Sequence, residues 1–472
     1  MASTFPGVIA FAFLAVMILV GTFLRARVPW LRSALVPASL IGGLVGFVLV
    51  SADLSLGYTS GDFAAFTFHF FTLSFMSLCL TGSDEGRGGG RSVVPGGTWL
   101  SVIWVMSLVM QALVGLAVVA AYNMAAGEDL SAYLGMIVTH GFTQGPGQAL
   151  ALGAIWEREL GIAHAMSFGL IYASVGFVAA FAIGVPAARF AIRRGLNANR
   201  SARLDEAFVT GLMPRSSNLS AGRQITHPAN VDTLAFHLGM LGVAYVITDQ
   251  YLQFMQPLAA TVRLLGVNLG LVFSHDLFFF HGLMVCVALR VLLDRAGFGH
   301  LIDNETQRRI TGASVDLMVV ATLMSIEVAL LSAFIVPIAL VCLTVTASTV
   351  ALCFGFGRKL ASLGPERALT AFGCCCGSTG SGLLLLRILD PDLSSGIGKE
   401  LAFFNIAILL LGFHVLMLMA PILPSYSLGS VVGVYAATFA VGAVALVVLA
   451  RRLSAAVVTA GAPEPEDPRS RG

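Results

Sequence analysis

The chain has 472 residues, of which 57% are hydrophobic and only 11% are charged, and its formal net charge is +2. Soluble globular proteins carry about a quarter charged residues, so this composition excludes that class. Several apolar runs reach the roughly 20 residues that a helix needs to cross a bilayer. The arginines lie between those runs, where they set orientation, so no nucleic-acid partner is indicated. We therefore expect an all-α polytopic membrane protein.

Hydropathy predicts about 11 transmembrane helices, and residues 1–189 contain the first group of them. Their predicted ranges are about 6–24, 33–51, 63–81, 97–121 and 163–189. Loops with arginine alternate with loops without it, beginning with Arg25, Arg27 and Arg32 in the first loop. Because cytoplasmic loops carry the excess of basic residues, the N-terminus is predicted to lie outside. The first apolar run lacks the features of a cleaved signal, so we expect a retained helix.

A helix break interrupts the apolar residues 134–156, which contain Gly-Phe-Thr-Gln-Gly-Pro-Gly-Gln at positions 141–148. Glycine adds backbone freedom and Pro146 has no N–H to donate, so a helix cannot run through. The loop before this segment has no arginine, and the helix after it ends at Arg189. The segment must therefore begin and end on the outer side, which predicts a re-entrant hairpin. Unpaired backbone at membrane depth is tolerated only where it is packed in protein or lines a wet cavity.

A second half follows a polar connector at residues 190–231, which is predicted to be cytoplasmic. Its predicted helices are about 232–254, 277–294, 313–330, 333–357 and 400–420. A second re-entrant loop at 366–390 contains Gly-Cys-Cys-Cys-Gly-Ser-Thr-Gly-Ser-Gly from position 373. The basic residues place this loop on the inner side, so residues 232–420 repeat residues 1–189 in inverted orientation. Two inverted five-helix repeats with one glycine-rich hairpin each are typical of secondary transporters.

The remaining segments lie outside this repeat. Residues 255–276 fit no predicted helix and are compatible with a segment along the outer interface. An additional helix at about 429–450, within residues 421–452, ends at Arg451 and Arg452 and places the C-terminus in the cytoplasm. The Pro- and Glu-rich tail at 453–472 is predicted to be disordered.

The two breaks supply the candidate binding residues. Free N–H groups and helix N-termini suit a substrate carboxylate, while carbonyl and hydroxyl oxygens suit a sodium ion. The candidates are Thr143, Gln144, Gly145, Gly147 and Gln148 in the first break and Gly377, Ser378, Thr379, Gly380 and Ser381 in the second. The alternative is that the Ser, Thr and Gln side chains only satisfy the backbone of their own loop.

Glu327 is the candidate for ion coupling, because it lies in the predicted helix 313–330 and a charge inside an apolar helix is costly. The alternative is that it lies near the outer end and is solvated. Four further histidines are expected to hydrogen-bond neighbouring helices rather than shuttle protons: His69, His237, His281 and His414.

Other chemistry is not supported by the sequence. The seven cysteines lack the spacing of a metal site, so we expect small packing residues, with no disulfide, metal or cofactor. The glycine run after Gly377 lacks the Gly-Lys-Ser/Thr ending of a phosphate loop. Thr379 stands where an intramembrane serine protease would have its nucleophile. We therefore predict that the protein is not an enzyme.

The chain resembles the bacterial sodium/glutamate symporter family over most of residues 6–420. Besides the two breaks, the resemblance rests on Val-Pro-Ala-Ser-Leu-Ile-Gly-Gly-Leu at 36–44, Ser-Phe-Gly-Leu at 167–170 and Leu-Met-Ser at 323–325. The first break has Gln-Gly-Pro-Gly-Gln at 144–148 where that family usually has Gly-Gly-His-Gly-Thr, and Thr379 is the residue kept from its Thr-Pro-Thr. The resemblance implies a small anionic substrate, sodium coupling and a homodimer in which a carrier domain moves against a dimerising scaffold.

We therefore expect a transporter of the inner cell membrane that couples sodium to the uptake of L-glutamate or a related small carboxylate by alternating access. Two alternatives remain open. One is a carrier coupled to protons through Glu327 or a histidine, and the other is an anion or solute channel built from the same re-entrant loops.

Overall fold

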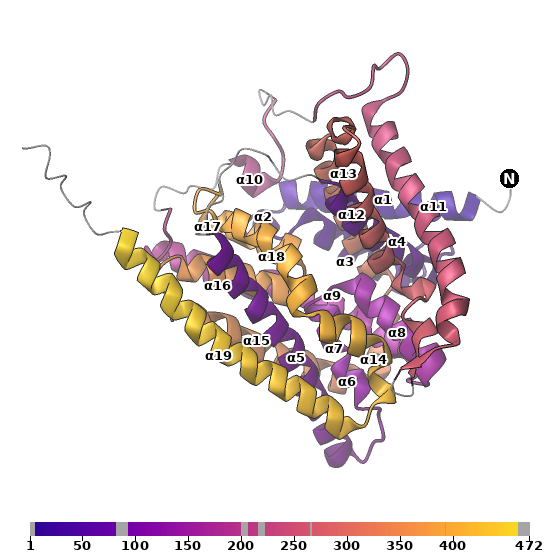
Figure 1. The fold of residues 1–472 in the computed structure, drawn as a ribbon, viewed down its shortest axis with the longest axis vertical. Helices are drawn as coiled ribbons and strands as arrows, with labels where there is room; N and C mark the ends of the chain where they lie inside the picture. The colour runs from indigo at the N-terminus through magenta and orange to yellow at the C-terminus, as the bar shows by residue number, and fades with distance from the viewer. Residues whose placement is uncertain are drawn as a thin grey trace, which may run out of the picture.

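The computed structural model describes residues 5–81, 93–199, 206–215, 222–264, 267–391 and 393–460. These residues are almost entirely helical (Figure 1). Their strands are β1 (Arg263–Leu264) and β2 (Val267–Asn268), which form one short antiparallel hairpin. Seven helices are long and apolar enough to cross a membrane, and shorter apolar helices accompany them. The expected all-helical membrane class is confirmed.

The helices of the first half follow the predicted order. They are α1 (Phe5–Arg27), α2 (Pro29–Ala34), α3 (Ala38–Ser51), α4 (Ser60–Leu80), α5 (Val93–Ala126), α6 (Tyr133–Met136), α7 (Val138–Phe142), α8 (Pro146–Leu160), α9 (Ala165–Arg193) and α10 (Glu206–Thr210). The short helix α2 occupies the first arginine-containing loop. The break predicted within residues 134–156 separates α7 from α8.

The second half begins with α11 and ends with the long helix α19. Its elements are α11 (Thr233–Ala260), η1 (Leu269–Leu271), η2 (His275–Leu277), α12 (Phe278–Arg295), η3 (Gly299–Leu301), α13 (Asn304–Met324), α14 (Val328–Ala333), α15 (Ile335–Gly357), α16 (Gly364–Cys376), α17 (Thr379–Leu389), α18 (Ile397–Leu411), the π-helix η4 (His414–Met419), the 3-10 helix η5 (Ala420–Ser425) and α19 (Leu428–Ala460).

Several predicted boundaries differ from the structure, among them the end of the helix predicted at 232–254, which continues to Ala260 as α11. The predicted helix 313–330 is wrong, because α13 ends at Met324 and a separate helix begins at Val328. The predicted helix 400–420 changes to a π-helix after Leu411. The last helix continues to Ala460, beyond its predicted end, and the rest of the predicted tail, residues 461–472, lies outside the described residues.

Polar caps fix the start of several helices. Thr59 and Asp62 form a capping box at α4, in which Asp62 accepts from the Thr59 N–H at 2.7 Å. Asp232 caps α11 by accepting from the Leu234 N–H at 2.8 Å. Asp303 caps α13 in the same way. These residues satisfy N–H groups that the first turn of a helix leaves unpaired.

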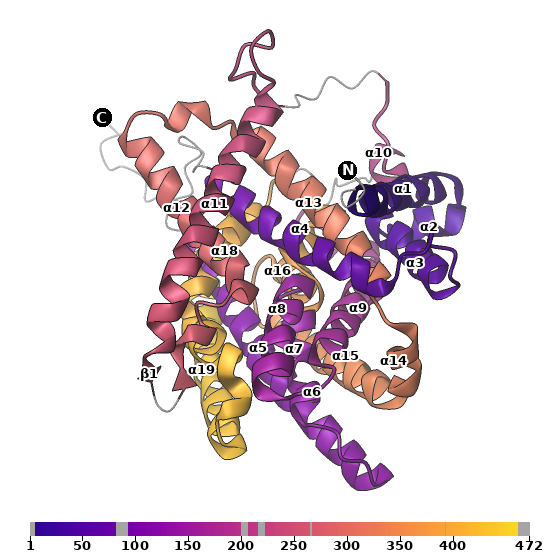
Figure 2. The same ribbon diagram turned by 90° about the vertical axis from the view of Figure 1, so that its right-hand side faces the viewer.

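The helices form two groups, which are visible in Figure 2. The α4 group contains α1, α3, α4, α11, α12 and α13, and in it α13 packs along α3 and α4. The α5 group contains α5, α7, α8, α9 and α15 to α19, and in it α5 packs on α15, α18 and α19. The largest hydrophobic cluster, around Trp99, Trp156 and Phe372, fills the α5 group. Both groups draw helices from both halves of the chain.

Glycines allow close contact within and between the groups. A Cβ at Gly42, in the proline-then-double-glycine motif of α3, would lie 2.0 Å from the Met17 carbonyl oxygen of α1. A Cβ at Gly147 of α8 would lie 2.0 Å from the Phe71 ring of α4. The first glycine brings α1 and α3 together, and the second brings the start of α8 against the α4 group. The first break is thus held at the contact between the two groups.

Candidate functional site

The first break lies between α7 and α8. Gly145 has φ of +97°, a left-handed conformation that favours glycine, and Pro146 begins α8 at a position where no N–H is needed. Thr143 and Gln144 are buried, and Gln148 in the first turn of α8 is half-buried. Residues 143–145 thus separate α7 from α8, and the first turn of α8 lies against Phe71 of α4.

The second break lies between α16 and α17. Gly377 has φ of −149° and ψ of −81°, which ends α16, and the Ser378 hydroxyl caps α17 by accepting from the Ser381 N–H at 3.3 Å. Ser381 is buried, Ser378 and Thr379 are half-buried, and Gly380 is exposed. The Thr379 hydroxyl donates to Asn405 Oδ1 of α18 at 3.1 Å. A second helix N-terminus therefore begins beside the first break.

The two breaks meet. The Thr143 hydroxyl lies 3.2 Å from the Cys375 carbonyl oxygen of α16, to which it can donate, and these residues are 232 positions apart. A Cβ at Gly145 would lie 3.6 Å from the Gly377 carbonyl oxygen, and these two residues have the same separation in the sequence. The structure thus brings the two candidate loops together at one junction, which we call the central junction.

Gln111 of α5 is the polar centre of this junction, and its side chain is fully buried. Its Oε1 accepts from the Thr143 hydroxyl at 2.7 Å. Its Nε2 lies 2.9 Å from the Cys375 carbonyl oxygen and 3.0 Å from both the Thr349 and the Ser107 hydroxyl oxygens. One amide thus joins α5, α15 and both breaks.

Two further side chains support the first break. Gln144 Oε1 accepts from His140 Nδ1 at 2.5 Å, and His140 Nε2 is buried with no partner among the described residues. Trp104 of α5 donates its indole N–H to the Thr143 carbonyl oxygen at 3.2 Å. Gln148 makes no hydrogen bond within the described part of the chain, so its amide is the group in this break that remains available to a ligand.

The sequence analysis missed Gln111, His140 and Thr349. Gln111 is the lone amide inside the predicted helix 97–121, and that contrast is a signal that could have identified it. His140 directly precedes the first glycine of the break. Thr349 gave no signal, because a threonine in an apolar helix commonly bonds to its own backbone, as Thr349 also does to Val345.

Glu327 lies away from the central junction. It occupies the turn between α13 and α14 and is exposed, because the helix in which it was predicted to lie ends at Met324. The Ser325 hydroxyl donates to the Thr322 carbonyl oxygen at 2.8 Å where that helix stops. The Ser167 hydroxyl of α9 donates to Glu327 Oε1 at 3.3 Å.

The other predicted residues have structural partners. The four histidines each lie within hydrogen-bond distance of a protein group, as expected: His69 near Tyr245, His237 with Thr233 and Asp303, His281 with Val272, and His414 with Thr438. The three adjacent cysteines at 374–376 are buried in α16, where Cys374 Sγ lies 2.4 Å from the position of a Cβ at Gly382. The absence of a side chain at Gly382 thus lets α17 approach α16 beside Cys374.

A buried ion pair anchors the second break. Arg367 of α16 and Glu400 of α18 form two parallel contacts, at 2.9 Å and 2.6 Å, with side chains only 5% and 6% exposed. The adjacent Glu366 accepts from the Ala198 N–H at 2.6 Å, which ties the connector to the same place. Removal of one partner of such a pair strongly destabilises the folded protein, because the other charge stays buried without a partner. The first turn of α16 is thus joined to α18.

The described residues include seven helices long enough to cross a membrane, and the two breaks meet among these helices. This arrangement defines a multi-pass membrane protein with a polar centre. The chain matches the family model of the sodium/glutamate symporter over residues 7–382, and it belongs to this family. The matched range includes α7, α8 and both breaks. Curated proteins give no significant match. The protein is therefore a membrane transporter and not an enzyme.

Proposed function

We propose that the protein is a sodium-coupled symporter of L-glutamate or a related small carboxylate, and that the central junction is its binding site. The observation that carries this proposal is the meeting of two broken helices at Gln111. Family membership supports sodium and glutamate as the cargo.

Inverted repeats at residues 1–189 and 232–420, joined by the connector 190–231, explain why the breaks meet as they do. When two repeats are related by a two-fold axis, a residue contacts the equivalent residue of the other repeat only if both lie close to the axis. The Thr143–Cys375 contact joins residues 232 positions apart, which is also the separation between Gly141 and Gly373, the first glycines of the two breaks. Each helix group also takes corresponding elements from the two halves: α4 with α13, and α5 with α15. This arrangement supports a pseudo-two-fold axis through the central junction.

The junction offers suitable groups for both ligands. The N–H groups of Gly147 and Gln148 in α8 and of Thr379 and Gly380 in α17 lie in the first turns, where helix geometry gives them no partner within their own helix. The positive ends of both helix dipoles favour a carboxylate. The Gln148 amide and the Ser378 and Thr379 hydroxyls are half-buried beside them. Hydroxyl and carbonyl oxygens are also the ligands that a sodium ion takes in such sites.

The two helix groups provide the moving parts for alternating access. The α5 group carries both breaks and the main core, while the α4 group contacts it through α8 and α9. We propose that the α5 group is the carrier and the α4 group the scaffold of a homodimer, with the N-terminus outside and the C-terminus in the cytoplasm. Sodium entry would supply the drive, at about 2.3 kcal/mol per charge per 100 mV.

Uptake of labelled L-glutamate into proteoliposomes tests the proposal. The expected result is accumulation under an inward sodium gradient, and none with potassium or a proton gradient alone. Accumulation driven by protons without sodium would establish the proton-coupled alternative instead. Glutamate flux that runs only down the glutamate gradient, is not coupled to an ion gradient and does not saturate with glutamate concentration would establish a channel. Either of these outcomes contradicts sodium symport.

A further inference from the structure

A cavity of about 440 Å³ lies on the α4 group, away from the central junction. It opens where α4, α11 and the start of α12 meet. Its lining consists of five aromatic rings, one carboxylate and one valine: Phe68, His69, Tyr245, His275, Phe278, Asp249 and Val246. No step of the proposed transport uses these residues.

Aromatic rings form the walls of the cavity. The ring centroids of Tyr245 and Phe278 are 4.9 Å apart, and those of His275 and Phe278 are 6.3 Å apart. The ring centroids of His69 and Tyr245 are 6.3 Å apart. The faces of such rings carry partial negative charge and attract cations within about 6 Å. The walls therefore suit a cationic group carried on an apolar body.

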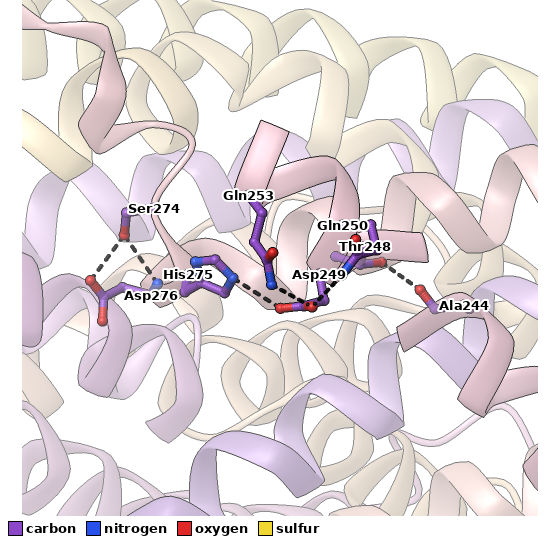
Figure 3. Close-up of polar contacts among 8 residues, drawn as sticks. All are labelled: Ala244, Thr248, Asp249, Gln250, Gln253, Ser274, His275 and Asp276. Carbon is purple, nitrogen blue, oxygen red and sulfur yellow. Dashed lines mark hydrogen bonds and ion pairs between the residues drawn. The ribbon is translucent and has the colours of Figure 1, made fainter. Parts of the chain in front are cut away.

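Asp249 adds a negative charge with an open acceptor position (Figure 3). Its Oδ2 accepts from the Gln253 and Gln250 amides at 2.8 Å and 3.1 Å, while Oδ1 faces only His275 Nε2, at 3.1 Å. A carboxylate oxygen has two lone pairs, so Oδ1 can accept one more hydrogen bond. The Asp249 side chain is 39% exposed. Ser274 caps η2 and thereby fixes His275 beside Asp249.

The cavity opens onto the apolar face of α11. Val246 at its mouth is exposed, as are the apolar residues Leu238, Val243, Ile247, Phe254 and Leu258 of the same helix. A Cβ added at Gly239 or Gly242 would contact nothing within 4 Å. Helical spacing puts Gly239, Gly242 and Val246 on one side of α11. A hydrocarbon chain can lie along this strip with its polar head in the cavity.

We propose that this cavity binds the primary ammonium group of an amphiphile, a phospholipid of the phosphatidylethanolamine type, whose acyl chain lies along α11. The ammonium N–H groups donate to Asp249 Oδ1, and the rings of Tyr245 and Phe278 face the charge. The bilayer around the protein supplies such molecules. Lipid binding at this site does not depend on which substrate is transported, so the site can be tested separately from the proposed symport.

Native mass spectrometry of the full-length protein tests the site. The protein in detergent is titrated with phosphatidylethanolamine, phosphatidylcholine and phosphatidylglycerol that have identical acyl chains. We expect the ethanolamine lipid to bind about tenfold more tightly than the glycerol lipid. Asp249→Asn should weaken its binding about fivefold, and Val246→Trp, at the exposed mouth, should block it. The matched control Glu128→Gln, on an exposed carboxylate away from the cavity, should leave it unchanged.

Further arms separate the possible occupants. Free ethanolamine that displaces the lipid at equal concentration would show that a soluble amine, not a lipid, is the ligand. Equal affinity for all three lipids, or for choline and ethanolamine lipids, would overturn the role of the open acceptor on Asp249. Efficient cross-linking of two copies through Val246→Cys would show that a second chain covers the cavity, which also overturns the proposal.

Discussion

Replacing Gln111 by leucine removes a buried amide that bonds to both breaks while keeping the volume of the core. Three of its hydrogen bonds run between helices, to Thr143, Thr349 and Cys375. Thr143 keeps a second acceptor in the Cys375 carbonyl oxygen at 3.2 Å, and the Thr349 hydroxyl keeps its bond to Val345 at 2.7 Å. The substitution should therefore loosen the central junction while the Thr143 and Thr349 hydroxyls keep partners, and the buried Ser107 hydroxyl loses its contact at 3.0 Å with Gln111 Nε2.

The size of the effect follows from these three bonds. Interhelical hydrogen bonds in membrane proteins contribute about 0.6 kcal/mol each on average, so their loss amounts to about 2 kcal/mol. Since about 1.4 kcal/mol corresponds to tenfold, the arranged junction becomes less favourable by up to about thirtyfold. We expect the apparent affinity for glutamate to fall by up to that factor, because both helix N-termini lose their fixed relative position.

Sodium-driven uptake over a range of glutamate concentrations measures this change. Ser101→Ala is the matched control, because Ser101 is also buried on α5 but bonds only to Gly97 of its own helix. Combining Gln111→Leu with Thr143→Val should cost less than the sum of the single effects, since the two side chains bond to each other. Wild-type KM and Vmax in Gln111→Leu would refute the assignment of the central junction as the binding site.

Two further substitutions test the supports of the site. Arg367→Met should destabilise the protein by about 3–5 kcal/mol, because it leaves the Glu400 charge buried and unpaired. The loss is measured as a drop in Tm. Adding Glu400→Gln should restore part of the lost stability, and no recovery in the double variant would contradict the pairing. Gly147→Ala should abolish uptake, because its Cβ would lie 2.0 Å from the Phe71 ring. The matched control Gly355→Ala, in helix α15 with nothing within 4 Å of the added Cβ, should retain uptake, and equal uptake by both variants would contradict the close contact.

The two breaks could be predicted from the sequence because their signals are local. Gly145 and Pro146 cannot continue a helix, and Gly377 and Ser378 end and restart one within two residues. The predicted inverted repeat also indicated that residues 232 positions apart in the two breaks occupy equivalent positions. The contact between Thr143 and Cys375 follows from that symmetry, although its donor and acceptor do not.

The rest could not be predicted because it depends on long-range packing. Gln111 bonds to Thr349, which lies 238 positions further along the chain. Its partner in Cys375 is the backbone carbonyl group, and because every residue carries one, the sequence does not single out this acceptor. The end of α13 at Met324 was missed because the residues after it remain apolar enough to read as one helix. Glu327 therefore looked intramembrane, while the structure places it in an exposed turn.

The charge balance at the central junction implies that sodium and substrate bind together. Residues 141–150 and 373–383 contain no lysine or arginine, so no fixed cation in either break faces an incoming carboxylate. Helix N-termini contribute only about half a charge each. A bound sodium ion would supply the remaining positive charge, and linkage then requires the substrate to raise sodium affinity by the same factor. Glutamate binding that is equally tight with and without sodium would contradict this coupling, even if the protein transports glutamate.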